Sequence, residues 1–80
     1  SAAEEIAVGV AGAVQRLRSL DLQKAPGVAE AIDWVGALSL LGVSRLDGAV
    51  VGSTLGSALK YREDLDLVVE RGTAWVAGAE

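Results

Sequence analysis

The stretch from Ala25 to Val43, APGVAEAIDWVGALSLLGV, decides the fold of this 80-residue chain. It holds the only proline, one of the two tryptophans and the densest run of apolar residues. A helix over residues 27–42 is predicted, with Pro26 at its first turn, where the missing N–H of proline needs no partner. Apolar residues recur at steps of three and four, the period of one helix face: Ala31, Ile32, Trp34, Val35, Leu38 and Leu41. We therefore expect the other helices to pack against this one.

The length and composition describe one small domain with a high apolar content. Eighty residues fit a single domain, and a core of that size supplies only about 3–5 kcal/mol of stability. Hydrophobic residues make up 51% of the chain, and its mean hydropathy is +0.39. This excess indicates either an efficient helical core or an apolar face that belongs against a neighbour.

The charged residues and the absent residue types exclude several classes of function. The net charge is −4 and the basic residues are scattered, so nucleic acid is not an expected partner. No apolar run reaches the roughly 18–20 residues of a membrane span. The absence of cysteine fits a reducing compartment, and we expect a cytoplasmic protein. The N-terminus, Ser-Ala-Ala-Glu-Glu, lacks both a signal peptide and a Met, which indicates a fragment of a longer protein or a processed or tagged chain.

Two further helices are predicted from apolar spacing, one near each end of the chain. The first covers residues 3–20, with acidic residues in its first turn and arginines in its last turn, as the helix dipole favours. The other covers residues 62–76. Their expected inner faces are Ile6, Val10, Val14 and Leu17 in the first, and Leu65, Val68, Val69, Gly72 and Val76 in the second.

A third additional helix is predicted over residues 48–60, with Asp47 as its N-cap. Its stripe is Val51, Leu55, Ala58 and Leu59. Gly52 and Gly56, four residues apart, indicate a close contact with another helix. Together with the helix over residues 27–42, these predictions define an all-α fold, a small four-helix bundle.

The chain lacks the side chains that most catalytic sites use. Without His or Cys, the usual pairs of nucleophile and base are missing, and no GxxxxGK[ST] phosphate loop is present. Glu63, Asp64 and Asp66 offer carboxylates for a hard cation, but first-turn acids favoured by the helix dipole are the preferred interpretation. Glu30 and Asp33 are expected on a solvated face. No catalytic and no metal-binding residue is predicted within the chain itself.

Two features allow either a structural or a ligand-binding role. They are Trp34 and the start of the helix over residues 27–42. Trp34 is expected in the core rather than against a ligand. Gly27 and Val28 have backbone N–H groups at a helix N-terminus, where anions bind, although a capped and solvated start is the simpler interpretation.

Two blocks carry a family resemblance: Lys24-Ala-Pro-Gly-Val-Ala-Glu-Ala-Ile-Asp-Trp34 and Leu59-Lys60-Tyr61-Arg62-Glu63-Asp64. Shorter matches are Ala37-Leu38, Leu46-Asp47 and Thr54-Leu55-Gly56. With these residues the chain resembles the C-terminal part of MoxR-type AAA+ ATPases, most closely the CoxD-like group. The resemblance spans roughly residues 6–70.

The resemblance implies the helical lid domain of a larger AAA+ protein, whose Walker motifs lie in an upstream α/β domain. Such a lid helps to close the nucleotide site and to couple ATP hydrolysis to chaperone-like remodelling, or to cofactor or metal insertion, in client proteins. ATP and magnesium would be cofactors of the parent ATPase and not of this fragment alone. The implied partners are the upstream domain, neighbouring subunits of a hexameric ring and a von Willebrand factor A protein.

Four residues are the candidates for contact with the nucleotide by their position in the resemblance: Pro26, Gly27, Val28 and Glu30. Many AAA+ lids also carry a sensor-2 arginine at the start of the equivalent helix. This chain has no arginine between Arg18 and Arg45. The alternative to the lid is a stand-alone helical module that presents a groove to a partner protein and ignores nucleotide.

Overall fold

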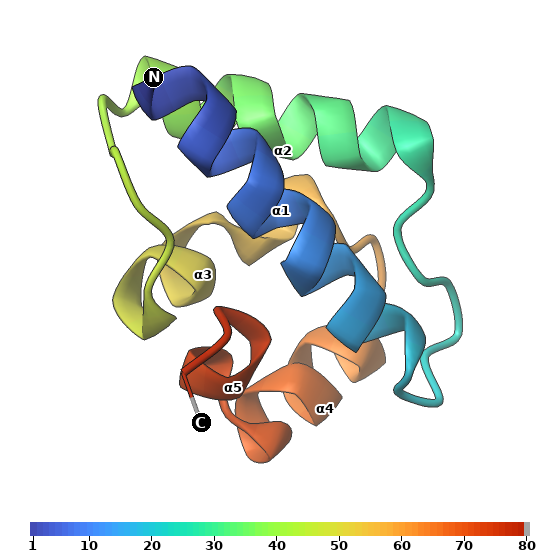
Figure 1. The fold of residues 1–80 in the computed structure, drawn as a ribbon. Helices are drawn as coiled ribbons and strands as arrows, with labels where there is room; N and C mark the ends of the chain where they lie inside the picture. The colour runs from blue at the N-terminus through green and yellow to red at the C-terminus, as the bar shows by residue number, and fades with distance from the viewer. Residues whose placement is uncertain (80) are drawn as a thin grey trace.

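Helix α1 (Ala2–Arg18) runs across the middle of the computed structural model, which describes residues 1–79 (Figure 1). Helix α2 (Val28–Leu40) lies on one side of α1, and the shorter helices lie on the other. These are α3 (Gly48–Thr54), the 3₁₀ turn η1 (Leu55–Ser57), α4 (Arg62–Arg71) and α5 (Thr73–Val76). Residues 1–79 contain no strand, so the predicted all-α class and small helical bundle are confirmed.

Helix α1 has the inner face that its sequence predicts. Ile6, Val10, Val14 and Leu17 are all buried. At the start of the helix, the Ser1 hydroxyl accepts a hydrogen bond from the Glu4 N–H at 3.3 Å, and the Glu4 carboxylate accepts one from the Ser1 amine at 3.0 Å. This reciprocal cap satisfies N–H groups that the first turn leaves without partners. The helix ends at Arg18, two residues before the predicted end.

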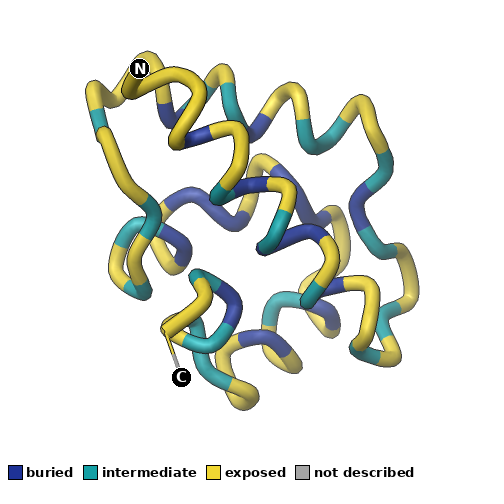
Figure 2. The backbone as a smooth tube through the Cα atoms, in the orientation of Figure 1, coloured by how far each residue is buried: buried dark blue, intermediate teal, exposed yellow. Residues whose placement is uncertain are grey.

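Helix α2 buries a narrower face than its apolar spacing predicts. Only Trp34 and Leu38 are fully buried, whereas Ile32 is 65% and Leu41 is 63% exposed, so the prediction is wrong for these two residues. Figure 2 shows that most of α2 is exposed or half-buried. The reason is that α2 lies at the edge of the bundle, where it packs on α1, α3 and η1 and leaves its remaining surface uncovered.

The two ends of α2 are set by glycines. The N-cap is Gly27, so Pro26 lies one residue before the cap, is buried, and is not in the first turn as predicted. At the other end, Gly42 adopts φ +71°, and the Val43 N–H donates to the Leu38 carbonyl at 3.3 Å. A glycine in this left-handed conformation ends a helix without a steric penalty.

The predicted helix over residues 48–60 is shorter than expected. Asp47 is its N-cap, because its carboxylate accepts a hydrogen bond from the Val50 N–H at 2.8 Å. The helix tightens into η1 after Thr54, whose hydroxyl donates to the Val50 carbonyl at 2.6 Å. Such a bond back to the preceding turn disturbs a regular helix. The predicted stripe is nevertheless buried as a whole: Val51, Leu55, Ala58 and Leu59.

The predicted helix over residues 62–76 is divided at Gly72. This residue has φ +117° and ψ 120°, a conformation that L-residues with a side chain rarely adopt. The chain turns there, and α5 returns to pack on α3. Val68 and Val76 are buried as predicted, but Val69 is exposed, contrary to the prediction.

The closest helix contact lies at a different glycine from the predicted pair. A Cβ added to Gly48 would lie 3.1 Å from the Cα of Ala74 in α5. At Gly52 the nearest such contact is 3.9 Å, and at Gly56 there is none within 4 Å. Gly48 therefore allows α3 and α5 to approach each other, and the predicted contact through Gly52 and Gly56 is wrong.

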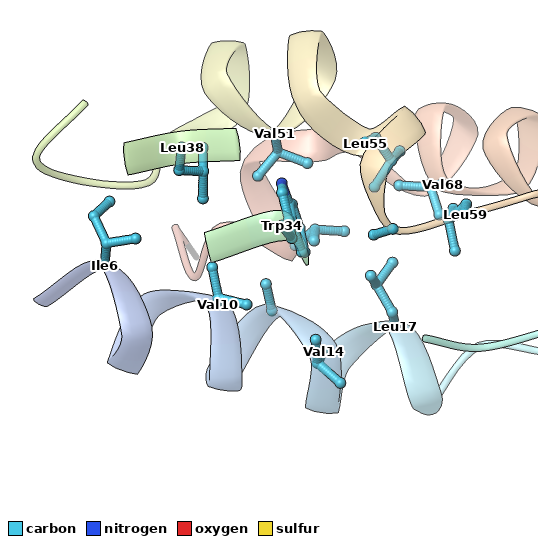
Figure 3. Packing of buried hydrophobic residues seen from close by; sticks show 13 residues of the cluster. Ile6, Val10, Val14, Leu17, Trp34, Leu38, Val51, Leu55, Leu59 and Val68 are labelled. Atoms are coloured by element: carbon cyan, nitrogen blue, oxygen red, sulfur yellow. The ribbon is translucent and has the colours of Figure 1, made fainter. Parts of the chain in front are cut away.

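Trp34 lies at the centre of the core, between side chains of α1 and α3 (Figure 3). It is fully buried, and its indole Nε1 donates a 2.8 Å hydrogen bond to the Thr54 hydroxyl. Its role in the core is therefore confirmed. Within residues 1–79, no helix is both long and apolar enough to cross a membrane.

Candidate functional site

The start of α2 brings together the four residues that the sequence predicts to contact a nucleotide. They are consecutive or nearly so: Pro26, Gly27, Val28 and Glu30. The Glu30 carboxylate accepts the Gly27 N–H at 2.9 Å, and the Pro26 carbonyl accepts a hydrogen bond from Arg18 Nε at 3.2 Å. Val28 is exposed. Their assignment to a nucleotide stays a prediction.

Glu30 was expected on a solvated face, and its side chain also accepts the backbone N–H of Gly27, the N-cap of α2. Its hydrogen bond with the Gly27 N–H lowers the pKa of its carboxyl group below the ordinary value, and the positive charges of Lys24 and Lys60 lower it further. The charged Glu30 carboxylate therefore already accepts the Gly27 N–H, one of the backbone donors at this helix N-terminus. An anion that binds here has to compete with that carboxylate. Asp33, predicted on the same face, is exposed.

Asp64 holds the connector between α1 and α2, which comprises residues 19–27. Its two carboxylate oxygens accept hydrogen bonds from the backbone N–H groups of Gln23, at 2.7 Å, and Lys24, at 3.0 Å. Its side chain is 0% exposed, although it lies in the first turn of α4. A buried carboxylate is tolerated where such bonds replace its hydration.

Glu63 and Asp64 lie in the first turn of α4, as the preferred interpretation of the acidic cluster predicted. Asp64 is turned into the protein, while Glu63 and Asp66 remain exposed. Residues 1–79 contain no group of three or more acidic side chains placed to hold a metal ion. Sequence analysis missed the bond to the connector because it joins residues 40 and 41 positions apart. The only signal was the presence of both segments in the resemblance.

An apolar groove runs between α1 and α2 and has a volume of about 460 Å³. Its floor contains the buried Val10 and Val14, and its α2 wall carries the exposed Val28 and Ile32. Arg18 is its one charged lining residue. The full lining is Ala7, Val10, Ala11, Val14, Gln15, Arg18, Gly27, Val28, Ala31, Ile32 and Val35.

Arg18 is fixed at the end of this groove where α2 begins. The hydrogen bond from its Nε to the Pro26 carbonyl holds the guanidinium beside Gly27 and Val28. Among residues 1–79, its other two guanidinium nitrogens have no hydrogen-bond or ion-pair partner. Arg16 differs, because it donates from Nη1 to the Val76 carbonyl at 2.9 Å and so ties α1 to α5. The site can therefore combine apolar contact with recognition of one anionic group.

Comparison of the chain with protein-family models, curated proteins and solved structures finds no significant match. The functional assignment therefore depends on the residues and the geometry of this chain.

Proposed function

We propose that the chain is the helical lid of a MoxR-type AAA+ ATPase. In this role it helps to close the nucleotide site and couples ATP hydrolysis to chaperone-like remodelling, or to cofactor or metal insertion, in client proteins. The parent protein would bind ATP and magnesium in an upstream α/β domain. It would act in the cytoplasm as a ring, usually a hexamer, with a von Willebrand factor A protein as a further partner.

One observation carries this proposal: the two separate blocks of the family resemblance meet in space. Asp64, at the end of the second block, binds the backbone at Lys24, where the first block begins. Trp34, at the end of the first block, binds Thr54 in one of the shorter matches. Residues that resemble the family thus act on each other, which is expected if the resemblance reflects a shared fold. A chance likeness of short segments would not require such contacts.

Two features of the surface support a role within a larger assembly. Val28 and Ile32 are exposed on α2 near its start, and Leu40 and Leu41 are exposed at its end. A lid docked on a nucleotide-binding domain and on a neighbouring subunit would cover such residues. In this proposal Pro26, Gly27, Val28 and Glu30 lie nearest the nucleotide, and an anionic group that binds the Gly27 N–H has to displace the Glu30 carboxylate.

The experiment that tests the proposal is to determine the sequence of the parent gene upstream of Ser1. A GxxxxGK[ST] loop followed by an acidic strand end, within about 200–250 residues, is expected because that is the size of one α/β domain. An initiation codon immediately before Ser1, or an unrelated upstream domain, would contradict it.

The second candidate is a stand-alone helical interaction module, and the groove between α1 and α2 favours it. Helical domains bind partner helices in such apolar grooves. This alternative predicts that the chain functions without any linked phosphate-loop domain. The upstream sequence therefore distinguishes between the two candidates.

A further inference from the structure

We infer that the groove between α1 and α2 binds an amphipathic α-helix of another protein, with a carboxylate of that helix paired to Arg18. The inference does not depend on the ATPase proposal, since it follows from the lining of the groove alone. It deepens the second candidate function, on which it rests, by naming the chemistry of the partner that the groove would bind.

The walls of the groove are shaped for a helix. Ala7 and Ala11 are exposed and lie one turn apart on α1, and on α2 Val28 and Ile32 have the same spacing. Rows of side chains four residues apart are the ridges between which a third helix packs. The alanines are small, so a helix can approach α1 closely and reach the floor at Val10 and Val14.

The exposure of the walls argues against a small-molecule pocket. Val28 is 73% exposed, and Ile32 is similarly open to solvent. Pockets for small ligands usually enclose about 70–90% of the ligand surface. A helix laid along the groove would instead cover these two side chains and remove their apolar surface from water.

Charge complementarity identifies the polar group of the partner. Arg18 is the one charged residue in the lining, while the chain as a whole has a net charge of −4. The net negative charge of the chain disfavours an acidic helix, whereas Arg18 attracts its carboxylate at the groove. Because the Pro26 carbonyl already holds the guanidinium, little side-chain freedom is lost when a carboxylate binds. The two guanidinium nitrogens without partners in residues 1–79 can donate to both oxygens of that carboxylate.

The test selects binders for the 80-residue chain from a displayed library of helical peptides of about 16 residues, roughly four turns, with one face randomised. We expect selected peptides to carry apolar residues at i, i+3, i+4 and i+7 and an Asp or Glu near one end. Affinity, measured by fluorescence anisotropy, should fall at least about tenfold with Ala11→Lys and with Arg18→Glu. Replacing the peptide carboxylate by Lys should weaken binding to the unaltered chain and restore binding to Arg18→Glu.

Ala49→Lys is the matched control, because Ala49 is also an exposed helical alanine but lies on α3, outside the groove. It should leave peptide affinity unchanged. Melting temperatures verify that each variant is folded, and Ala7→Lys replaces Ala11→Lys if the latter unfolds.

Four results would overturn the inference. One is selection of peptides without acidic enrichment, and another is unchanged binding to both folded lysine variants of the groove. The third is saturable binding of decanoate at the groove with no helical peptide selected, which would assign the groove to an aliphatic carboxylate. The fourth is a concentration-dependent dimer that Ala11→Lys dissociates, which would assign it to a second copy of this chain.

Discussion

The indole of Trp34 donates its buried N–H to the hydroxyl of Thr54, at 2.8 Å, and this bond joins α2 to the end of α3. The same hydroxyl donates to the Val50 carbonyl at 2.6 Å, so it acts as acceptor and donor at once. Both bonds lie at the point where α3 tightens into η1. The largest side chain of the core is thus fixed in position by a polar residue of another helix.

Thr54→Val keeps the shape of this side chain and removes the acceptor of the indole N–H. We expect a loss of about 1–3 kcal/mol in the free energy of unfolding, the cost of a buried donor without a partner. Urea unfolding measures the loss. Thr54→Ser is the control, since it keeps the hydroxyl and loses one methyl group, worth about 0.8 kcal/mol. If Thr54→Val equals the unaltered chain in stability, the bond contributes nothing.

Asp64→Ala should be among the most destabilising substitutions in the chain. It removes two hydrogen bonds to a charged group, each worth about 1.5–3 kcal/mol, and leaves two backbone donors of the connector without partners. Thermal unfolding followed by circular dichroism measures the effect. Asp66→Asn, an exposed position on the same helix, should stay within about 0.5 kcal/mol. Equal effects of the two variants would mean that the buried carboxylate does not hold the connector.

The cap of α2 should make stability depend on pH. The pKa of Glu30 is lowered in the folded chain, first by the Gly27 N–H, so the unfolded chain binds this proton more readily. The contribution of Glu30 is therefore present above the ordinary pKa that it has in the unfolded chain, and it is lost as the pH falls through the lower folded pKa. The melting temperature of Glu30→Gln should lie below that of the unaltered chain at pH 7, and the gap should narrow in acid. A gap independent of pH would contradict the assignment.

Two glycines should respond to alanine in opposite directions. Gly36 lies inside α2, and a Cβ there meets nothing within 4 Å, so Gly36→Ala should stabilise the chain by about 0.5–1 kcal/mol. Gly72 has φ +117°, where a residue with a Cβ is strained, so Gly72→Ala should lower the free energy of unfolding of the chain by about 1–2 kcal/mol. Chemical denaturation of both variants measures the signs. Stabilisation by Gly72→Ala would mean that α4 and α5 can join as one helix.

The isolated chain should bind ATP weakly or not at all. The Gly27 N–H is already engaged by Glu30, and no arginine lies between Arg18 and Arg45. Isothermal titration calorimetry with magnesium and ATP measures the affinity. Micromolar binding would show that the start of α2 recognises nucleotide without an upstream domain, and Gly27→Pro, which removes that N–H, would then be the control.

Short-range features of this fold follow from the sequence, and features set by neighbours do not. The buried face of α1 and the Asp47 cap depend on spacing and on residues within one turn, so both were predictable. Ile32 has the same spacing as buried residues of α2, yet it is exposed, because no element packs against that side of the helix. Periodicity identifies the apolar face of a helix. How much of that face is buried depends on which other elements pack against it.

The candidate site shows the same division. The residues that begin α2 are close in sequence, and their proximity was therefore predictable. The groove needs the antiparallel approach of α1 and α2, and Arg18 enters it through a bond to the Pro26 carbonyl. Nothing in the local sequence distinguishes Arg18 from Arg16, whose guanidinium binds the opposite end of the chain. Nor does it distinguish the buried Asp64 from the exposed Asp66.

The bond between Asp64 and the connector also determines how this chain can fold. In the loop between α1 and α2, the backbone at Gln23 and Lys24 is held by Asp64, a residue 41 and 40 positions later. Contacts of such sequence separation form late, because the intervening segment must first be ordered. We therefore expect the hairpin not to be autonomous when expressed without α4, and the two halves of the chain to unfold in a single cooperative transition.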